Sequence, residues 1–303
     1  MKIAIEAKKL HKHYNSFHAL KGIDLSVYEG EVFGFLGPNG AGKTTTIRCL
    51  LDLIRPSSGE VKIFGTDPLK NSVEVKKQMG YLPGELNLDD RLTARQSLQL
   101  FADMRNCKVS WAWIENHAEK LKLNLDTKIK NFSKGNKQKV GIIQAFMHKP
   151  RLLILDEPTS GLDPLMQKQV LKMVMASKKE GATVFFSSHI LSEVEEVSDR
   201  VAIIRDGIII DTAVVENLLA KNMRRVSVTC SSDIDIDGLL QKLPNVKLLE
   251  KKEKTVVLQV SKDLAKVINY CTPYEIKDFV TSQPSLEEIF LTYYTGEYSE
   301  KMK

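Results

Sequence analysis

A glycine-rich segment, Gly37 to Thr44, has the residue types and the spacing of a loop that binds phosphate groups. It reads G-P-N-G-A-G-K-T, which fits the pattern G-x-x-x-x-G-K-[ST]. Its glycines let the backbone turn several N–H groups toward one anion, and Lys43 can reach the β- and γ-phosphates of a nucleotide. The Thr44 hydroxyl group can bind Mg²⁺. The residues expected to contact the nucleotide here are Gly37, Pro38, Asn39, Gly40, Ala41, Gly42, Lys43, Thr44 and Thr45.

Two adjacent carboxylates, Asp156 and Glu157, follow the apolar run Leu152 to Leu155. Such a run is suited to a buried parallel strand, and an acid at its end can face the phosphate loop. Asp156 is therefore expected to hold Mg²⁺. Glu157 has left the strand and is expected to orient and deprotonate an attacking water molecule. The alternative for this pair is a solvated strand end.

The elements that must position these residues begin with a strand before the loop, Glu31 to Leu36, and a helix after it, Thr44 to Ile54. The helix presents its positive N-terminal end to the phosphates. Upstream, Ile3 to Leu10 and Ala19 to Val27 predict two antiparallel strands, and Glu60 to Phe64 predicts a short strand downstream.

The middle of the chain predicts helices and buried strands in alternation. Residues 93–148 are mostly helical by their spacing of apolar side chains. A second helix begins at Asp163, as N-cap, with Pro164 in its first turn, and closes near Gly181. Thr183 to Phe186 predicts a buried strand, and 201–210 predicts a hairpin with a tight Asp-Gly turn. The core is thus an α/β domain with a helical insertion at about 85–148.

The pattern changes near residue 222 to short alternating segments. We expect strands at 225–231, 246–251, 255–260 and 275–281, and helices at 235–243, 262–270 and 285–294. This β-α-β-β-α-β order predicts a small ferredoxin-like α+β domain. Its polar residues form no catalytic group in the sequence, so a structural or regulatory role is expected.

Composition indicates a globular protein without a membrane span. The 303 residues are 43% hydrophobic and 27% charged, and the net charge of +6 is spread along the chain. That modest charge favours a solvated surface over nucleic-acid binding. No apolar stretch reaches the roughly 20 residues that cross a bilayer, and the N-terminus lacks a signal-peptide core. The four cysteines are scattered and are expected to be reduced.

Four blocks of the sequence together resemble the ATP-binding subunit of an ATP-binding-cassette (ABC) transporter. They are Gly37–Thr44, Phe132–Gln138 (F-S-K-G-N-K-Q), Leu152–Asp163 and Ser188–His189. The resemblance covers residues 2–220. It implies a P-loop NTPase cassette at 1–221, with a mixed sheet, an antiparallel β subdomain and the helical subdomain at 85–148. The accessory domain at 222–303 is similar, through Pro284–Phe290, to the tails of bacterial ABC exporter ATPases.

The resemblance also implies residue roles. Tyr14 would stack on adenine, although a packing role is the alternative. Ser133 and Gly135 would contact the γ-phosphate of ATP held by the other subunit of a dimer. Asp163 would couple the two sites, which is compatible with its use as an N-cap. His189 would contact the γ-phosphate and the attacking water, so that Lys43, Glu157 and His189 are the catalytic residues. The other five histidines are interpreted as surface or packing residues.

The implied substrate and metal are ATP and Mg²⁺, and the implied partners are a polytopic membrane permease and a second ATP-binding subunit. The pair is a homodimer or a heterodimer, with no nucleic acid and no direct membrane insertion. The expected location is cytoplasmic, on the inner face of the membrane through the permease. The helical insertion and residues 80–92 are expected to dock the permease. Two alternatives stay open: a soluble ABC ATPase acting on ribosomes or DNA, and a regulatory ATP-binding module with little turnover.

Two positions depart from the family pattern. The signature L-S-G-G-Q is replaced by F-S-K-G-N, with Lys134 in the first glycine position. The family also has a glutamine after Gly-Tyr-x-Pro that senses Mg²⁺ and the permease. Here Gly84 takes that position, and Glu85 is a candidate for the missing oxygen ligand.

Overall fold

The computed structural model describes residues 2–220, 224–260 and 264–282. The chain divides into two compact units, Met1–Val215 and Glu216–Lys303. This division falls at the start of helix α8 (Val215–Ala220), whereas the sequence analysis places the domain boundary after residue 221. Each unit is described by itself.

The first unit contains a six-stranded sheet and a three-stranded sheet. Its strands are β1 (Ile3–Tyr14), β2 (Phe17–Tyr28), β3 (Val32–Leu36), β4 (Ser58–Ile63), β5 (Met79–Leu82), β6 (Leu152–Asp156), β7 (Thr183–Ser188), β8 (Arg200–Arg205) and β9 (Ile208–Val214). Its helices are α1 (Lys43–Leu50), α2 (Ser72–Lys77), α3 (Ala94–Arg105), α4 (Trp111–Lys120), α5 (Lys134–Phe146), α6 (Pro164–Lys179) and α7 (Leu191–Val197), with a 3₁₀ turn at Ile129–Asn131.

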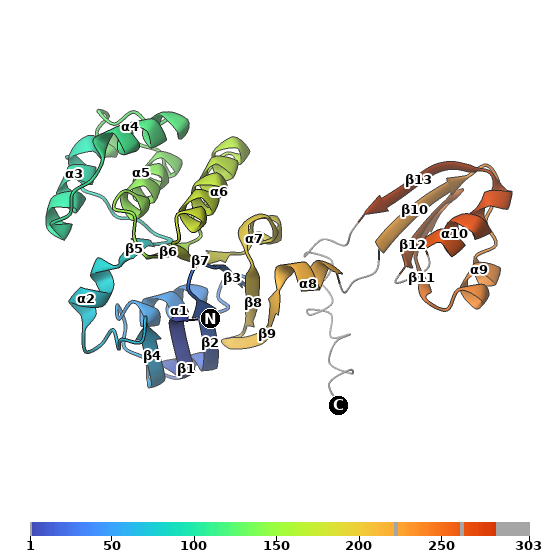
Figure 1. Cartoon of the computed structure of the whole chain (residues 1–303), viewed down its shortest axis with the longest axis horizontal. Helices are drawn as coiled ribbons and strands as arrows, with labels where there is room; N and C mark the ends of the chain where they lie inside the picture. Colours follow the sequence, from blue (N-terminus) through green and yellow to red (C-terminus); the bar gives the residue numbers. More distant parts are fainter. Residues whose placement is uncertain (1, 221–223, 261–263, 283–303) are drawn as a thin grey trace. The chain divides into compact units, whose positions relative to one another are not determined.

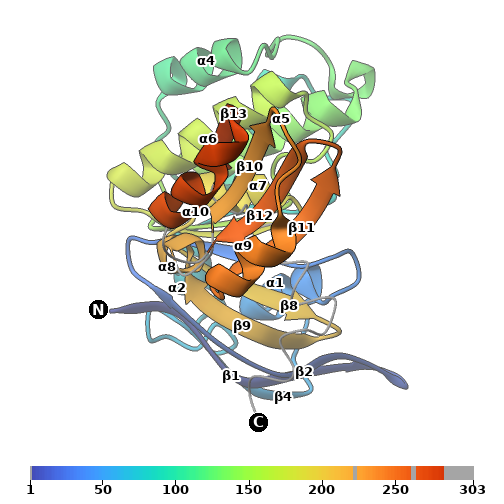
Figure 2. The same cartoon turned by 90° about the vertical axis from the view of Figure 1, so that its right-hand side faces the viewer.

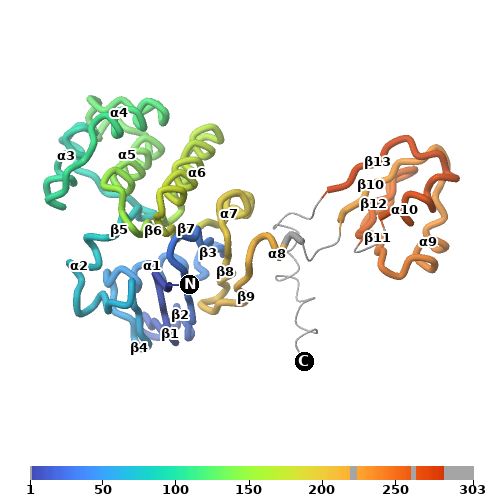
Figure 3. The backbone as a smooth tube through the Cα atoms, in the orientation of Figure 1, coloured from blue at the N-terminus to red at the C-terminus, as the bar shows by residue number. Residues whose placement is uncertain are grey.

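The large sheet has the strand order β5-β6-β7-β3-β8-β9 and is parallel except for the β8–β9 hairpin. Helices α3 to α6 lie on one side of it (Figure 1). Helix α1 and the antiparallel sheet β2-β1-β4 lie on the other side, as the tube trace also shows (Figure 3). The layers are the expected mixed cassette sheet, antiparallel β subdomain and helical insertion. Loops after parallel strands share one edge of the sheet, so the ends of β3, β6 and β7 meet there.

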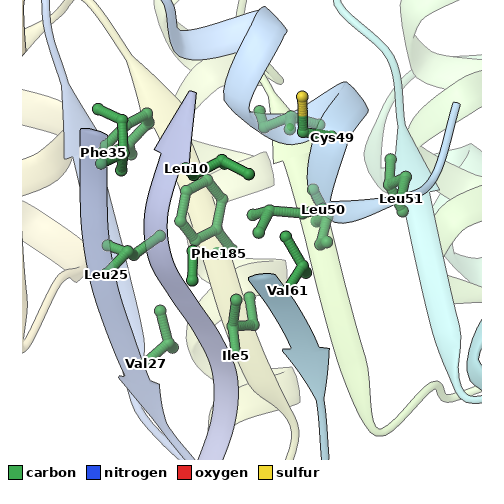
Figure 4. Close-up of a cluster of buried hydrophobic side chains, with 14 of the residues drawn as sticks. Ile5, Leu10, Leu25, Val27, Phe35, Cys49, Leu50, Leu51, Val61 and Phe185 are labelled. Carbon is green, nitrogen blue, oxygen red and sulfur yellow. The ribbon is translucent and has the colours of Figure 1, made fainter. Parts of the chain in front are cut away.

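The main hydrophobic core lies between the two sheets and α1. Figure 4 shows side chains from β1, β2 and β4 packed around α1 and against the central strands. Leu10, Leu50, Phe35 and Phe185 are all fully buried in it. Burial of each side chain of this size contributes about 1.5–3 kcal/mol to the stability of the fold. This packing therefore fixes α1 against the sheet, and with it the loop that precedes α1.

Several element boundaries differ from the sequence-based expectation. The first two strands are longer than expected and reach the turn at Asn15, where φ is 50°. Helix α1 ends at Leu50 instead of Ile54, because Asp52 takes a left-handed conformation with φ of 51°. Strand β5 and helices α2 and α7 were not anticipated. Each is only four to seven residues long, too short to give a clear periodicity.

Over residues 224–260 and 264–282, the second unit is a four-stranded antiparallel sheet with two α-helices. Its elements are β10 (Arg224–Cys230), α9 (Ile236–Lys242), β11 (Val246–Lys252), β12 (Thr255–Val260), α10 (Leu264–Cys271), a 3₁₀ turn (Thr272–Tyr274) and β13 (Ile276–Ser282). The strand order is β11-β12-β10-β13, and α9 and α10 cover one face of the sheet (Figures 1 and 2). This topology is consistent with the expected ferredoxin-like domain. The helix expected at 285–294 lies outside the described residues.

Candidate active site

The phosphate loop joins the end of β3 to the start of α1. A Cβ atom on Gly37 would lie 2.4 Å from the carbonyl oxygen of Ile204, so only glycine fits between the loop and β8. Gly42 is the N-cap of α1, with φ of 109° in the left-handed region. The first turn of α1 carries no acidic residue, which leaves its N-terminal N–H groups free of a competing negative charge. These features make the loop a fixed anion-binding turn.

The other expected loop residues line the same turn. Pro38, Asn39 and Gly40 are exposed, Ala41 is buried, and Thr45 is half-buried in the first turn of α1. The exposed side of the loop is therefore open to a ligand.

The side chain of Lys43 folds back against the first residues of the phosphate loop. Its side chain is only 6% exposed, and its Nζ donates to the carbonyl oxygens of Gly37, at 2.6 Å, and Pro38, at 3.2 Å. The same Nζ lies 3.1 Å from Oε1 of Glu157. The sequence placed Lys43 and Glu157 more than a hundred residues apart, and the fold brings the cation and the carboxylate into contact.

Asp156 lies at the end of β6 and is fully buried. The Thr44 hydroxyl donates to its Oδ2 at 2.9 Å, and the Ser187 hydroxyl donates to its Oδ1 at 2.7 Å. Burial, and then the negative charge of Asp156, raise the pKa of Tyr81 to about 12. Thr44 and Asp156 thus present adjoining oxygen donors of the kind that Mg²⁺ prefers, and they fit that ion.

Glu157 occupies a turn directly after β6. Its φ of 52° is unusual for a residue with a side chain, and its N–H donates to the carbonyl and hydroxyl oxygens of Ser187, both at 3.2 Å. Its Oε2 lies 2.6 Å from Nδ1 of His189. The backbone strain costs on the order of 1–3 kcal/mol and aims the carboxylate at Lys43 and His189. The three residues expected to be catalytic are therefore in direct contact.

Sequence reasoning missed three polar residues beside this group. Ser187 binds both acids, as described above. Ser188 Oγ donates to Oε2 of Glu193 at 2.8 Å, and Glu193 is 5% exposed. Burial is the main reason that the pKa of Glu193 is raised. The signal in the sequence was the pair of serines that ends the apolar run of β7, since polar side chains in a buried strand need partners.

The signature segment lies at the start of α5. Ser133 is the N-cap of this helix and accepts the Asn136 N–H at 3.3 Å. A Cβ atom on Gly135 would lie 2.6 Å from the carbonyl oxygen of Gly161, so the helix start is pressed against the segment before α6. One turn later, Nε2 of Gln138 donates to the carbonyl oxygens of Glu157 and Pro158, both at 3.2 Å. Helix α5 is thereby tied to the turn that holds Glu157 in the same chain.

Tyr14 and Asp163 lie apart from these contacts. Tyr14 is 42% exposed near the tip of the β1–β2 hairpin, with Nζ of Lys12 5.1 Å from its ring centroid. Asp163 is the N-cap of α6 and accepts the Met166 N–H at 3.0 Å, as expected from the Asp-Pro pair.

Gly84 lies directly beside the Asp156 carboxylate. A Cβ atom there would be 3.3 Å from Oδ2 of Asp156, and the next side chain, Glu85, is exposed. The position where the resemblance implies a glutamine therefore adjoins the expected Mg²⁺ ligand but offers no side-chain oxygen of its own.

Comparison with known proteins identifies the family. The model described as ABC transporter matches residues 20–160. The bacitracin transport ATP-binding protein BcrA of Bacillus licheniformis is 40% identical over 227 residues, which cover 74% of each chain. The chain belongs to the ABC transporter ATP-binding proteins. It is the ATP-binding and ATP-hydrolysing subunit of an ABC transporter.

Two further comparisons agree. The daunorubicin/doxorubicin resistance ATP-binding protein DrrA of Streptomyces peucetius is 32% identical over 95% of this chain and 91% of its own. A solved ATP-binding subunit of an ABC transporter is 32% identical and superimposes with a TM-score of 0.64, over 71% of this chain and 91% of that one. Among the described residues, no helix has the length and apolar character that crossing a membrane requires.

Proposed function

We propose that this subunit hydrolyses ATP with Glu157 as the general base. Glu157 Oε2 lies 2.6 Å from Nδ1 of His189, and its Oε1 lies 3.1 Å from Nζ of Lys43. These contacts carry the proposal. They place the Glu157 carboxylate, which can accept a proton, beside the His189 imidazole, which can orient that carboxylate, and beside the ammonium group of Lys43. Lys43 would neutralise negative charge on the β- and γ-phosphates, and His189 would orient the attacking water.

Thr44 and Asp156 would hold the Mg²⁺ ion of the nucleotide, and the ion would supply positive charge to its phosphate oxygens. Ser187 fixes the Asp156 carboxylate from the other side. The loop N–H groups from Gly37 to Thr45 would bind the phosphates, and Tyr14 would stack on the adenine ring. The exposed face of Tyr14 supports that role, since a buried packing residue would have no free face.

A second copy, or a homologous subunit, would complete the site through Ser133 and Gly135. Ser133 is exposed at a helix N-terminus and uses its hydroxyl within its own chain only to cap α5. A helix start of this kind favours a phosphate group brought by another molecule. ATP would then hold the two subunits together, and hydrolysis would remove the contacts that favour the closed pair.

The partner outside the pair would be a polytopic membrane permease. A groove between the end of α1, β5 and α3 supports docking there, because Leu51, Leu53, Phe101 and Leu86 line it with apolar surface. The drug-resistance role of the Streptomyces relative supports export as the direction of transport. The subunit would act on the cytoplasmic face of the membrane, with a cassette at 1–221 and an accessory domain at 222–303. No observation favours a role on ribosomes or DNA.

Steady-state ATP hydrolysis by the purified chain tests the catalytic assignment. Glu157→Gln removes the base and leaves the loop intact, so turnover should fall by at least about 100-fold while ATP affinity is retained. The matched control is Glu196→Gln, which alters an exposed acid of α7 that has no proposed role in the site. A Glu157→Gln variant that hydrolyses ATP at the normal rate would refute the role of Glu157 as base.

A further inference from the structure

Three histidines that the sequence analysis interpreted as surface or packing residues come together on the β1–β2 hairpin. His11 and His13 lie on β1, and His18 lies on β2. Their nearest ring nitrogens, one from each residue, all lie within 4.8 Å of one another. Within the described part of the chain, no other group of three histidine, cysteine or acidic side chains meets this spacing. The cluster is not part of the nucleotide site.

Strand geometry explains the gathering. His11 and His13 are two residues apart, so their side chains point to the same face of β1. His13 is paired directly with His18 across the hairpin. The rings of His13 and His18 stack with centroids 3.8 Å apart, and those of His11 and His18 stack at 5.4 Å. The register therefore sets the His13–His18 pair directly, whereas His11 is paired with Lys21 and its ring reaches His18 across the hairpin.

The nitrogen separation matches that of two ligands on one metal ion. Nδ1 of His11 lies 3.2 Å from Nε2 of His18. Two imidazole nitrogens at about 2.0–2.1 Å from a tetrahedral Zn²⁺ ion are about 3.3 Å apart. The same distance also fits a hydrogen bond between two neutral imidazole rings. The third histidine, His13, favours metal binding over that hydrogen bond, because it adds a third ring nitrogen to the cluster.

We propose that His11, His13 and His18 form a binding site for a transition-metal ion of the Zn²⁺ type. Three imidazole ligands leave a fourth position for water, and imidazole suits Zn²⁺, Ni²⁺ and Cu²⁺ far better than Mg²⁺. The site is thus chemically distinct from the oxygen donors Thr44 and Asp156.

The backbone of His11 and His13 is hydrogen-bonded to Ser57. Ser57 donates its N–H to the His11 carbonyl oxygen at 2.8 Å, and its hydroxyl accepts the His13 N–H at 2.9 Å. Gly22 leaves room for the His11 ring, since a Cβ atom there would lie 3.1 Å from its Nε2. A held strand limits the conformational entropy that the ligands would lose on binding an ion.

The cluster is accessible to an ion. His13 is exposed, and His11 and His18 are half-buried, so an ion can reach the cluster from solvent.

An ion at this site would act on the end of the strand that leads to Tyr14. Tyr14 follows His13 directly and pairs with Phe17 at the tip of the hairpin. Cross-linking His13 to His18 through a metal would fix that tip. This consequence rests on the proposed adenine-stacking role of Tyr14, whereas metal binding itself does not.

Titration of the full-length, untagged chain with Co²⁺ in the absence of nucleotide tests the site. We expect one equivalent of Co²⁺ to bind with visible ligand-field absorption and to be displaced by one equivalent of Zn²⁺, but not by a 1,000-fold excess of Mg²⁺. His13→Ala changes an exposed residue and should weaken Co²⁺ binding by at least about tenfold. His18→Gln should do the same, with circular dichroism used to verify that each variant is folded.

Two control variants separate the cluster from other donors. His117→Gln removes a histidine of α4, and Cys107→Ser removes the half-exposed thiol; both should bind Co²⁺ as the wild type does. Failure of the wild-type chain to bind Co²⁺ or Zn²⁺ would overturn the proposal, as would unchanged binding by folded His13→Ala. Loss of ATP hydrolysis has no bearing on this test, so it can fail while the proposed function stands.

Discussion

At the scale of single residues, the hydroxyl group of Ser187 contacts both acids of the proposed site. Ser187 donates to Asp156 at 2.7 Å and accepts the N–H of Glu157, so it orients the proposed metal ligand and the proposed base together. Its position at the end of β7 makes this possible, because β6 and β7 are neighbouring parallel strands that end at the same edge.

Replacing this hydroxyl should impair metal binding more than nucleotide binding. For Ser187→Ala we expect kcat to fall about tenfold and the Mg²⁺ concentration for half-maximal activity to rise, because Asp156 loses one of its two hydrogen bonds. Magnesium titration of the ATPase rate measures this. Ser177→Ala, in α6, is the matched control. An unchanged magnesium dependence would show that Ser187 is only a packing residue.

A half-buried histidine, His148, predicts how stability responds to acid. Burial, and then the charge of Arg105, lower its pKa from 6.5 to about 4. Between these values the unfolded chain takes up a proton that the folded chain does not. This histidine therefore makes the free energy of unfolding fall as the pH drops from 6.5 to 4.

The variant His148→Gln should remove this contribution. Its amide can still donate to the Met79 carbonyl oxygen, which His148 Nε2 contacts at 3.1 Å. Urea unfolding at pH 7 and at pH 4.5 should show a loss of stability that is smaller than in wild type, by on the order of 1–3 kcal/mol. An equal or larger loss would contradict this account of His148.

The proximity of the residues proposed to bind phosphate and metal could be predicted, because the chemistry of such a site fixes their types and spacing. The loop lysine, the paired acids and His189 all meet as expected. The histidine cluster could not be predicted, because it depends on the pairing of His13 with His18, and register depends on a bulged hairpin. Glu193 was missed for a similar reason, since its partner Ser188 belongs to another element.

At the scale of elements, the start of α5 is packed tightly against the segment before α6. The close approach of Gly135 to the Gly161 carbonyl oxygen leaves no space for a side chain. Gln138, one turn along α5, ties the same helix to the turn of Glu157 and Pro158 through their carbonyl oxygens. A change at the helix start should therefore affect the proposed base.

The variant Gly135→Ala tests this packing. Its Cβ atom would meet backbone, which cannot rotate away, so we expect the free energy of unfolding to fall by about 1–3 kcal/mol and ATPase activity to fall with it. Thermal unfolding measures the first effect. Asn136→Ala, in the same turn, is the control for stability. A variant as stable as the control would mean that α5 can shift without cost.

Long elements with clear ends could be predicted, and short ones could not. The Asp163 cap and Pro164 placed the start of α6, and the apolar runs placed β6 and β7. Strand β5 has four residues, one of which is glycine, and it is defined by its pairing with β6. The structure of such elements depends on tertiary contacts that local sequence does not carry.

At the scale of the whole molecule, the sequence predicted two folded units from a change in pattern near residue 222. Each unit has a hydrophobic core of its own, one between the two sheets and α1, the other beneath α9 and α10. The alternation of strands and helices predicted the order of elements in the second unit, and the observed topology is consistent with the ferredoxin-like prediction. The function of that unit does not follow from its core, because packing residues carry no chemistry.

The central proposal is that two ATP molecules join two subunits head to tail, each ATP bound at a site to which both subunits contribute. Multi-angle light scattering of Glu157→Gln with Mg²⁺ and ATP tests it most directly, since ATP that is not hydrolysed should hold the pair closed. We predict a dimer of twice the chain mass of 34.2 kDa with ATP, a monomer with ADP, and a monomer with ATP when Ser133→Arg is added. A protein that binds ATP tightly yet stays monomeric, alone and with its permease, would contradict the account.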